Sequence, residues 1–335
     1  MFFFKNLILT CLLSLLVPIV FRDEQRQFTI SGIAQGTDYT IKYYAKDSVV
    51  TRQDIEQILM QIDSSMSLYK PYSRITRFNQ AKEGIQIDEH FRKVLLKAWQ
   101  INKVTAGRFD ATVAPLVNAW GFGPAKINKI PDSATIRSLL PCVGMEKLKL
   151  QGSYLKKLQP CVEVDLNGIA QGYTVDVLAS HFLKKGVSSF VVELGGELRV
   201  HGRKPDGSLY KVGVEGPASA VSPEPGIRHV LGLRNGAVTT SGNYRKYIDV
   251  GGERISHLVD PKSGYPLRSK MISVTVYAKD ALTADGYDNA LMAMDVQQAL
   301  AVARAQKFEA YLIYQRDDGS VADTLTSGFR KLIID

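Results

Sequence analysis

The spacing of apolar residues predicts amphipathic helices along much of the chain. In residues 51–68, Ile55, Leu59 and Ile62 fall on one helix face, as a period of 3.6 residues requires. Thr51 stands before them, and its hydroxyl can cap the helix N-terminus. The same spacing predicts further helices at residues 90–104, 168–183, 283–294 and 299–305. A short helix that ends at residue 140 is predicted to follow a loop at residues 124–131.

Alternation of apolar and polar residues, the period of a strand, marks other stretches. It is clear in residues 28–44, which Gly32 and Gly36 interrupt, and in residues 188–200, which contain a double glycine. Helices and strands mix without strict alternation, so an α+β fold of mixed sheets and packed helices is predicted, as one compact unit. Further strands are predicted at residues 208–213, 227–233, from 238 onward, 271–278 and 309–314, with two short strands meeting at Gln151-Gly152.

The first 21 residues form a separate hydrophobic segment. Residues 6–21 contain no charged side chain, and Lys5 is the only charge before them. The segment is short for a spanning helix, which needs about 20 apolar residues, and no small-residue cleavage site follows it. We expect an uncleaved anchor in the cell inner membrane, with a cleaved signal as the second interpretation. Either places residues 22–335 on the periplasmic side.

Composition excludes several classes of protein. Hydrophobic residues make up 45% of the chain and charged residues 22%, which is typical of a globular protein and not of a disordered or polytopic membrane protein. Lys and Arg total 42 against 33 for Asp and Glu, a net charge of +9. The basic residues come as scattered pairs, which favours a solvated surface and disfavours nucleic-acid binding.

Two cysteines follow the hydrophobic segment, Cys142 and Cys161. A hairpin centred on Gln151-Gly152 would pair positions whose numbers sum to 303, which sets the two cysteines opposite each other. The same register sets Leu148 opposite Leu155 and Glu146 opposite Lys157. A disulfide, favoured by an oxidising compartment, and two packed thiols both stay open.

Two glycine-rich segments are candidates for contact with a ligand. In residues 165–173, glycines let backbone N–H groups face a phosphate at a helix N-terminus. The alternative is a plain turn in which Asp165 or Asn167 caps the helix. In residues 193–197, a double glycine inside a strand permits close approach by a ligand, and a β-bulge is the competing interpretation.

Two polar loops are further candidates. Residues 238–245 offer three hydroxyls, a glycine N–H and Arg245, a set that suits a phosphate, although a hairpin with solvated hydroxyls has the same pattern. His257 ends a strand before a rigid Asp260-Pro261 turn, where a proton-transfer group can be held. A hydrogen-bonded structural histidine is the alternative.

An acidic helix supplies candidate metal ligands. Asp285, Asp288 and Asn289 share one face of the helix predicted at residues 283–294. Three oxygen-bearing side chains together suit a hard cation such as Mg2+. The alternative is that both aspartates only complement the helix dipole.

Taken together, these segments resemble the ApbE family, the FAD:protein FMN transferases. The resemblance runs from about residue 28 to residue 330 and leaves out the hydrophobic segment. Its motifs are Gly36-Thr37, Met66-Ser67-Leu68-Tyr69 with Ser73 and Asn79, residues 107–116, Trp120-Gly121-Phe122-Gly123, residues 165–173, Gly195-Gly196-Glu197, Thr240-Ser241-Gly242, Ser256-His257 with Asp260-Pro261 and Gly264, and Ala284-Asp285.

The resemblance implies a T-fold-related α+β structure and a Mg2+-dependent enzyme. The family cleaves FAD and attaches FMN through a phosphoester bond to a Ser or Thr hydroxyl of an exported or membrane redox protein, releasing AMP. Two other functions stay open on the same residues. One is a Mg2+-dependent FAD pyrophosphatase, with water in place of the acceptor hydroxyl. The other is a non-catalytic FAD-binding protein.

The resemblance also assigns roles to individual residues. Tyr69 is expected to stack on a ring of FAD, and Asp165 to accept hydrogen bonds from its ribose or adenine. His257 is the candidate base for the acceptor hydroxyl. The remaining expected FAD contacts are Gln35, Arg108, Phe109, Asp110, Gln171 and the backbone of Leu258. The expected Mg2+ ligands are the carbonyl of Gly168 with Asp285, Asp288 and Asn289.

Three of these positions depart from the family's pattern. Asn289 stands where the family usually has Thr as a metal ligand, and its amide oxygen can serve with altered geometry. Gln171 replaces a residue that is commonly charged, and Gln35 one that is often apolar. These departures affect fine ligand contacts more than the reaction class.

Overall fold

A computed structural model describes residues 25–124, 129–216, 226–243, 247–250 and 253–335, and the hydrophobic segment predicted as an anchor lies outside these residues. Among the residues described, no helix combines the length and hydropathy needed to cross a bilayer. Helices and strands are mixed, so the predicted α+β class is confirmed.

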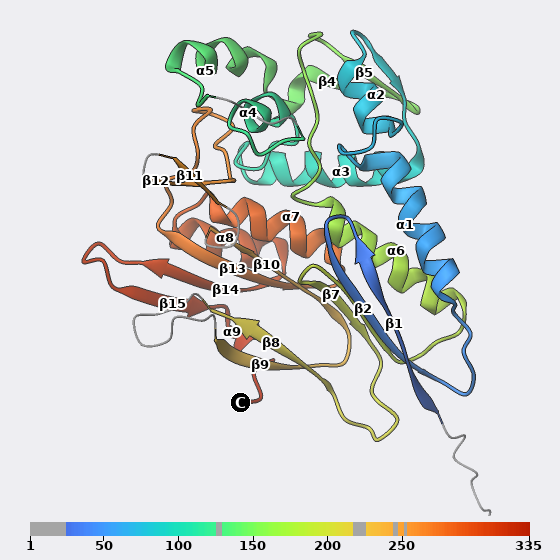
Figure 1. Ribbon diagram of the computed structural model, residues 1–335. Helices are drawn as coiled ribbons and strands as arrows, with labels where there is room; N and C mark the ends of the chain where they lie inside the picture. The colour runs from blue at the N-terminus through green and yellow to red at the C-terminus, as the bar shows by residue number, and fades with distance from the viewer. Residues whose placement is uncertain (1–24, 125–128, 217–225, 244–246, 251–252) are drawn as a thin grey trace, which may run out of the picture.

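An eight-stranded antiparallel sheet runs through the centre of the molecule (Figure 1). Its strand order is β1-β2-β6-β7-β10-β13-β14-β15, so that the N-terminal hairpin lies at one edge and the last hairpin at the other. The strands are β1 (Arg26–Ala34), β2 (Thr37–Ala45), β6 (Phe190–Leu194), β7 (Glu197–His201), β10 (Gly236–Gly242), β13 (Met271–Ala278), β14 (Glu309–Gln315) and β15 (Val321–Leu325).

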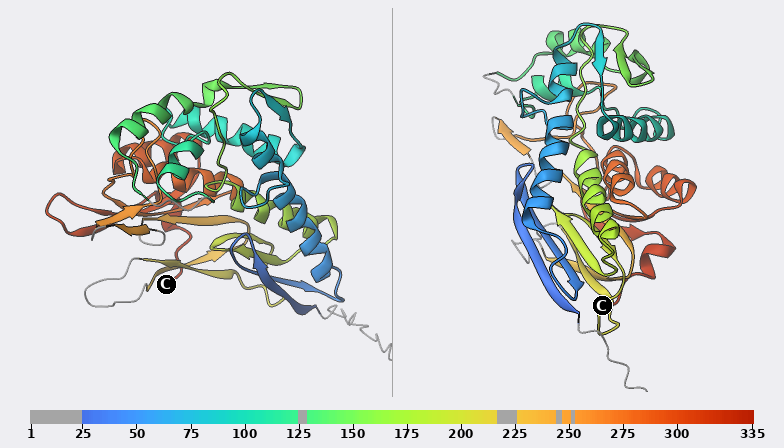
Figure 2. Two further views of the ribbon diagram at one scale, coloured as in Figure 1. Left: turned by 45° about the horizontal axis from the view of Figure 1, so that its top comes forward. Right: turned by 90° about the vertical axis from the view of Figure 1, so that its right-hand side faces the viewer.

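Helices cover one face of this sheet (Figures 1 and 2). The main apolar cores lie between the sheet and these helices. Helices α6 and α7 contact the central strands directly, and α1 and α3 pack on α6 and α7. The helices are α1 (Arg52–Met66), α2 (Arg74–Gln80), α3 (Glu89–Val104), α4 (Ala114–Ala119), α5 (Ser133–Leu139), α6 (Ala170–Lys184), α7 (Ala281–Met292), α8 (Val296–Gln306) and α9 (Ser327–Arg330).

The opposite face is covered by the antiparallel pair β8 (Tyr210–Glu215) and β9 (Ile227–Leu233), together with α9. A separate apolar core fills this layer around Tyr311 and Phe329. The other described strands are β3 (Gly84–Gln86), β4 (Leu148–Gln151) and β5 (Tyr154–Lys157), which form a small sheet, and the pair β11 (Tyr247–Val250) and β12 (Glu253–Ser256). The central strands β10 and β13 are therefore buried on both faces.

The helix predictions are confirmed, and α1 begins where the sequence places its cap. The Thr51 hydroxyl accepts from the backbone N–H of Asp54 at 3.1 Å, and the Asp54 carboxylate accepts from the N–H of Thr51 at 2.8 Å. This reciprocal pair is a capping box.

Two stretches predicted as strands are instead hairpins. Residues 188–200 form β6 and β7, and Gly195 and Gly196 are the turn between them, with φ values of 65° and 106°. The double glycine is therefore neither inside a strand nor a bulge. Residues 28–44 likewise divide at Gln35 and Gly36, with φ values of 52° and 79°. Two-residue hairpin turns with positive φ match the twist of the flanking strands, which explains both breaks.

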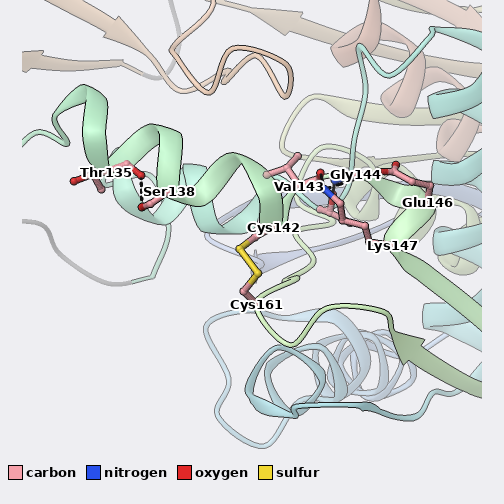
Figure 3. Close-up of a disulfide and its surroundings, with 9 residues drawn as sticks. Thr135, Ser138, Cys142, Val143, Gly144, Glu146, Lys147 and Cys161 are labelled. Carbon is pink, nitrogen blue, oxygen red and sulfur yellow. Dashed lines mark hydrogen bonds and ion pairs between the residues drawn. A yellow bond between two sulfur atoms is a disulfide. The ribbon is translucent and has the colours of Figure 1, made fainter.

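The predicted register of the β4–β5 hairpin is wrong. Leu148 pairs with Lys157 and Leu150 with Leu155, so paired positions sum to 305. The turn consists of Gly152, whose φ is 61°, and Ser153, one residue later than expected. Cys142 and Cys161 still form a disulfide, with a Cα–Cα distance of 5.3 Å, outside the strand ladder (Figure 3).

Helices α6 and α7 lie against each other unusually closely. A Cβ at Gly172 would lie 2.3 Å from the carbonyl oxygen of Ala281, so only glycine fits there. The carboxylate of Asp176 on α6 accepts from the N–H groups of Ala281 and Leu282 at 3.0 and 2.9 Å, and from the Arg199 guanidinium at 2.6 Å. The N-terminus of α7 is thus fixed to α6 and to β7.

Candidate active site

A cavity of about 550 Å³ lies where α1, the start of α6, α7 and the end of β10 meet. Its lining includes every residue to which the family resemblance assigned a role in binding or catalysis. These are Gln35, Tyr69, Arg108, Phe109, Asp110, Asp165, Gly168, Gln171, His257, Leu258, Asp285, Asp288 and Asn289. The structure therefore brings these residues together, while their individual roles stay predictions.

The carboxylates of α7 lie at the floor of the cavity and are almost fully buried. The exposed fraction is 3% for Asp285 and 1% for Asp288. One oxygen of Asp285 accepts from the N–H of Gly172 at 2.8 Å, which ties α7 to the first turn of α6. The polar face expected from helical spacing is thus an interior face, because α3, α6, β10 and β13 surround α7.

Oxygen atoms converge on the side-chain nitrogen of Asn289. This Nδ2 lies 3.2 Å from the carbonyl oxygen of Gly168, 3.2 Å from Asp285 Oδ1 and 2.9 Å from Asp288 Oδ1. The amide oxygen points the other way and accepts from the Ser241 hydroxyl at 3.2 Å. An amide N–H group here occupies a position that the surrounding oxygen atoms make suitable for a positive charge.

These four residues fit a hard cation by their chemistry. A carbonyl and two carboxylates are ligands that Mg2+ prefers. Asn289 can add its own oxygen only if its amide turns over. Within the described part of the chain, no group of three or more His, Cys, Asp or Glu side chains is arranged for a metal, so the set depends on the carbonyl and the amide.

The electrostatics of the floor favour positive charge. Burial raises the pKa of Asp288 well above its usual value, and the negative charge of Asp285 raises it further. The carboxylate of Glu197 acts in the same direction. Three acidic groups near one another in a buried position are costly when ionised, and a bound cation would remove that cost.

One wall consists of the segment from Arg108 to Val113. The Arg108 guanidinium donates to the carbonyl oxygen of Ala293 at 2.8 Å, at the C-terminal end of α7. The ring of Phe109 lies against Gly168. The carboxylate of Asp110 accepts from the N–H groups of Thr112 and Met145, from the Thr112 hydroxyl and from the Asn102 amide. Asp110 therefore holds the wall in place with hydrogen bonds inside the protein.

Asp165 and Tyr69 lie at another side of the cavity. One oxygen of Asp165 accepts from the N–H of Asn167 at 2.7 Å, and burial raises the pKa of this carboxyl. Burial also raises the pKa of Tyr69, and the charge of Asp165 adds to this effect, which shows that the two groups are close. Tyr69 is 62% exposed, so its ring is available to a ligand at the mouth of the cavity.

A buried lysine supports the segment before Asp165 through Asn79. The side chain of Asn79 bonds both the N–H and the carbonyl of Val164, at 2.8 and 2.9 Å. The Lys157 ammonium donates to the backbone carbonyl of Asn79 at 3.0 Å. Burial lowers the pKa of Lys157 to about 8. Lys157, which the sequence did not single out, thus supports the segment that ends at Asp165.

His257 lines the cavity beside an aromatic ring. The Phe122 and His257 ring centroids are 6.4 Å apart, and the rings meet edge to face. The next residue, Leu258, uses both backbone groups locally: its N–H donates to the Ser256 hydroxyl, and its carbonyl accepts from the N–H of Leu267. The loop is therefore well braced around the histidine.

The hydroxyl-rich segment predicted at 238–245 is not one loop. Residues up to Gly242 form β10, paired with both β7 and β13, and Tyr244 and Arg245 lie outside the described residues. The Thr240 hydroxyl pairs with that of Thr275 at 2.9 Å. Thr240, Ser241 and Gly242 line the cavity, and the Ser241 hydroxyl donates to the Asn289 amide oxygen there. Alternating strand geometry separates these side chains, which the hydroxyl-rich sequence alone did not reveal.

Two acidic residues of the cavity were given no role from the sequence, although Glu197 lies in the candidate segment 193–197. Asp63 is on α1, one residue after the buried Ile62, and burial raises its pKa. Glu197 follows the Gly195-Gly196 turn. The available signals were an acid next to the apolar face of α1 and a charge directly after a double glycine.

The sequence profile of the ApbE family matches residues 35–312. The chain belongs to the ApbE family. A relative from Haemophilus influenzae named FAD:protein FMN transferase is 37% identical over 324 residues, which are 93% of each chain. A relative from Vibrio cholerae with the same name is 35% identical, over 93% of this chain and 94% of that one.

Solved structures of the family share the fold. The flavin transferase ApbE from Vibrio cholerae superposes with a TM-score of 0.84 at 33% identity, covering 92% of this chain and 100% of that chain. The apo form of the flavinyl transferase ApbE from Pseudomonas stutzeri gives a TM-score of 0.81 at 32% identity, covering 92% and 97%. The family and the fold that the sequence motifs predicted are therefore confirmed.

Proposed function

We propose that this chain is a Mg2+-dependent FAD:protein FMN transferase. It cleaves the pyrophosphate of FAD, joins FMN through a phosphoester bond to a Ser or Thr hydroxyl of an acceptor protein, and releases AMP. The observation that carries the proposal is the meeting of two buried carboxylates and a histidine in one cavity, in a chain whose relatives bear that enzyme name.

The cavity walls supply the contacts that an FAD molecule needs. Tyr69 and Phe109 offer aromatic faces to the flavin or adenine ring. Asp165 uses one oxygen within the protein and has a second for a ribose or adenine group. Arg108 faces the cavity with a permanent positive charge, suited to a phosphate. Gln35 and Gln171 add amide groups at the edge.

Gly168, Asp285, Asp288 and Asn289 are the residues that would hold Mg2+. A cation held by these residues would supply charge neutralisation for the pyrophosphate and for the leaving phosphate of AMP. Without a cation, the carboxylates would repel the pyrophosphate. We therefore expect binding of FAD to depend on the metal.

His257 is the proposed general base. As the acceptor hydroxyl oxygen bonds to the phosphorus of the FMN half, the bond from that phosphorus to the AMP oxygen breaks. The hydroxyl proton passes to the imidazole and then to solvent. Phe122 beside the ring and the braced loop at Leu258 keep the imidazole oriented, as a general base requires.

The second substrate and the location are part of the proposal. The acceptor is a redox protein or subunit that works outside the cytoplasm. Residues 1–21 would anchor the enzyme in the inner membrane with its catalytic domain on the periplasmic side. The Cys142–Cys161 disulfide supports this location, because such bonds persist in oxidising compartments.

The test is direct flavin transfer. The full chain is incubated with FAD, Mg2+ and a periplasmic flavin-carrying subunit whose predicted acceptor Ser or Thr is present or replaced by Ala. We expect flavin fluorescence that stays on the acceptor after denaturation when its Ser or Thr is present, and none when that residue is replaced by Ala. One AMP should be released for each flavin attached. EDTA should abolish both the flavin fluorescence on the acceptor and the release of AMP.

The other two functions give different results in the same assay. Free FMN and AMP without labelled acceptor would indicate an FAD pyrophosphatase. Bound, intact FAD with no AMP would indicate a flavin-binding protein. Either outcome would overturn the transferase proposal.

A further inference from the structure

The Cys142–Cys161 disulfide joins two segments that both lead to the cavity. Cys142 ends a short 3-10 helix (Leu140–Cys142), and the chain then runs through Val143 and Gly144 to Met145. Cys161 lies four residues before Asp165. Figure 3 shows the bond bridging the end of this helix and the loop that carries Cys161.

The segment after Cys142 holds Asp110. The N–H of Gly144 donates to the Thr112 hydroxyl at 2.6 Å. The N–H of Met145 donates directly to the Asp110 carboxylate at 3.2 Å. Two of the contacts that fix this side of the wall thus come from residues two and three positions after the disulfide.

The segment after Cys161 holds the other side of the same wall. The N–H of Asp165 donates to the carbonyl of Ala111 at 2.8 Å. Val113 and Glu163 form a parallel bridge. Residues 110–113 therefore lie between the two segments that the disulfide joins, and they accept hydrogen bonds from backbone N–H groups of both segments.

We propose that the Cys142–Cys161 disulfide positions the Arg108–Val113 wall, so that the affinity for FAD depends on whether this bond is oxidised. The inference rests on the FAD site proposed above. The disulfide keeps the two flanking segments at a fixed separation, and the wall between them places Arg108 and Phe109 in the cavity. Cys142 and Cys161 are positioning residues, since neither lines the cavity.

The bond is open to reduction from one side. Cys161 is exposed, whereas Cys142 is 6% exposed. A dithiol can attack the Cys161 sulfur, displace the Cys142 thiolate and then close its own disulfide. Two electrons and two protons pass to the cysteines, and the dithiol becomes a disulfide. A periplasmic protein dithiol of the thioredoxin class is the matching reductant, and dithiothreitol is the laboratory probe.

The experiment measures FAD affinity directly, by flavin fluorescence titration with Mg2+ present, in oxidised and dithiothreitol-treated full chain. Thiol labelling and peptide mass spectrometry follow the state of Cys142 and Cys161. Reduction should raise the Kd for FAD about 3- to 30-fold, in the range of coupling through a packed network. The transfer rate at saturating FAD should change less than about threefold, because neither α7 nor His257 belongs to the two segments that the disulfide joins. Reoxidation should restore the parent affinity.

Two variants separate positioning from general stability. Cys161→Ala removes the exposed partner and leaves the buried Cys142 in place. Its Kd for FAD should therefore match that of the reduced parent and should not change when dithiothreitol is added. Phe329→Leu weakens the core on the opposite face of the sheet, none of whose residues lines the cavity. It should lower the melting temperature and leave the Kd for FAD unchanged.

An unchanged Kd in fully reduced, folded protein would overturn the inference, as would an equal rise of the Kd in Phe329→Leu. Binding of FAD by the oxidised parent without FMN transfer would refute only the proposed reaction, and the redox comparison would still be decisive. No binding of FAD by the oxidised parent would overturn both.

Discussion

The closest contact between α6 and α7 offers a sharp test of how the floor of the cavity is built. In Gly172→Ala, the new Cβ would lie 2.3 Å from the Ala281 carbonyl oxygen and 2.7 Å from the Asp285 Cβ. Backbone atoms cannot rotate away, so the helices must separate by about 0.7 Å or more to reach a tolerable contact. The hydrogen bond from the Gly172 N–H to Asp285, now 2.8 Å, would then exceed the usual range.

The expected magnitudes differ for stability and for chemistry. Alanine gains about 1 kcal/mol of helix propensity over glycine, and overpacking costs about 1–3 kcal/mol. The net loss of stability is therefore small, and the melting temperature should fall by less than about 8 °C. Displacing Asp285 by nearly 1 Å should weaken Mg2+ binding and slow FMN transfer about 100-fold.

The assay combines thermal melts, Mg2+ titration by calorimetry and FMN transfer to the acceptor. Gly286→Ala is the matched control, since its Cβ meets the ends of the Ile101 and Ile169 side chains, which can move. It should keep Mg2+ binding and transfer within about tenfold of the parent. A Gly172→Ala protein with parent-level transfer and Mg2+ affinity would show that the α6–α7 contact does not set the position of Asp285.

Three further predictions concern single side chains. Asp288→Asn removes a buried like-charge contact with Asp285, so the protein should stay folded and melt no lower, yet lose calorimetric Mg2+ binding; retained binding would contradict its role as a ligand. His257→Ala should keep FAD and Mg2+ affinity and slow transfer about 10²–10⁴-fold, and a parent-level rate would exclude it as the base. Lys157 has a pKa lowered to about 8 against about 10.4 in an unfolded chain, so between these values the unfolded state binds more protons and stability rises with pH. Urea unfolding at pH 7 and pH 10 measures the free energy of unfolding of the parent and of Lys157→Met. The stability of the parent relative to the variant should be greater at pH 10 than at pH 7, and an equal difference at both pH values would refute this assignment.

Local patterns in the sequence were enough to predict the helices, and the family resemblance was enough to predict which residues line one cavity. The Thr51 cap and the apolar face of α1 are local features, so the start of α1 follows from them. The polar motifs were correctly expected to share one cavity, because the family resemblance links segments far apart in the chain.

Features that depend on three-dimensional context were not predictable in the same way. The β4–β5 register changed because the turn begins at Gly152 and not one residue earlier. Helical spacing placed Asp285 and Asp288 on one face, but it does not tell a solvent face from a cavity face. Nothing in the sequence singled out Lys157, and only its burial against Asn79 shows that it supports the segment that ends at Asp165.

The carboxylate of Asp176 has a consequence for how the cavity can move. It accepts three charge-assisted hydrogen bonds, two from the start of α7 and one from Arg199. At about 1.5 kcal/mol each, breaking the two bonds that join α6 to α7 costs about 3 kcal/mol, so fewer than about one molecule in a hundred is open there at any moment. The two helices beneath the cavity therefore move as one rigid body. Any adjustment that admits or releases a dinucleotide must come from the walls around this base.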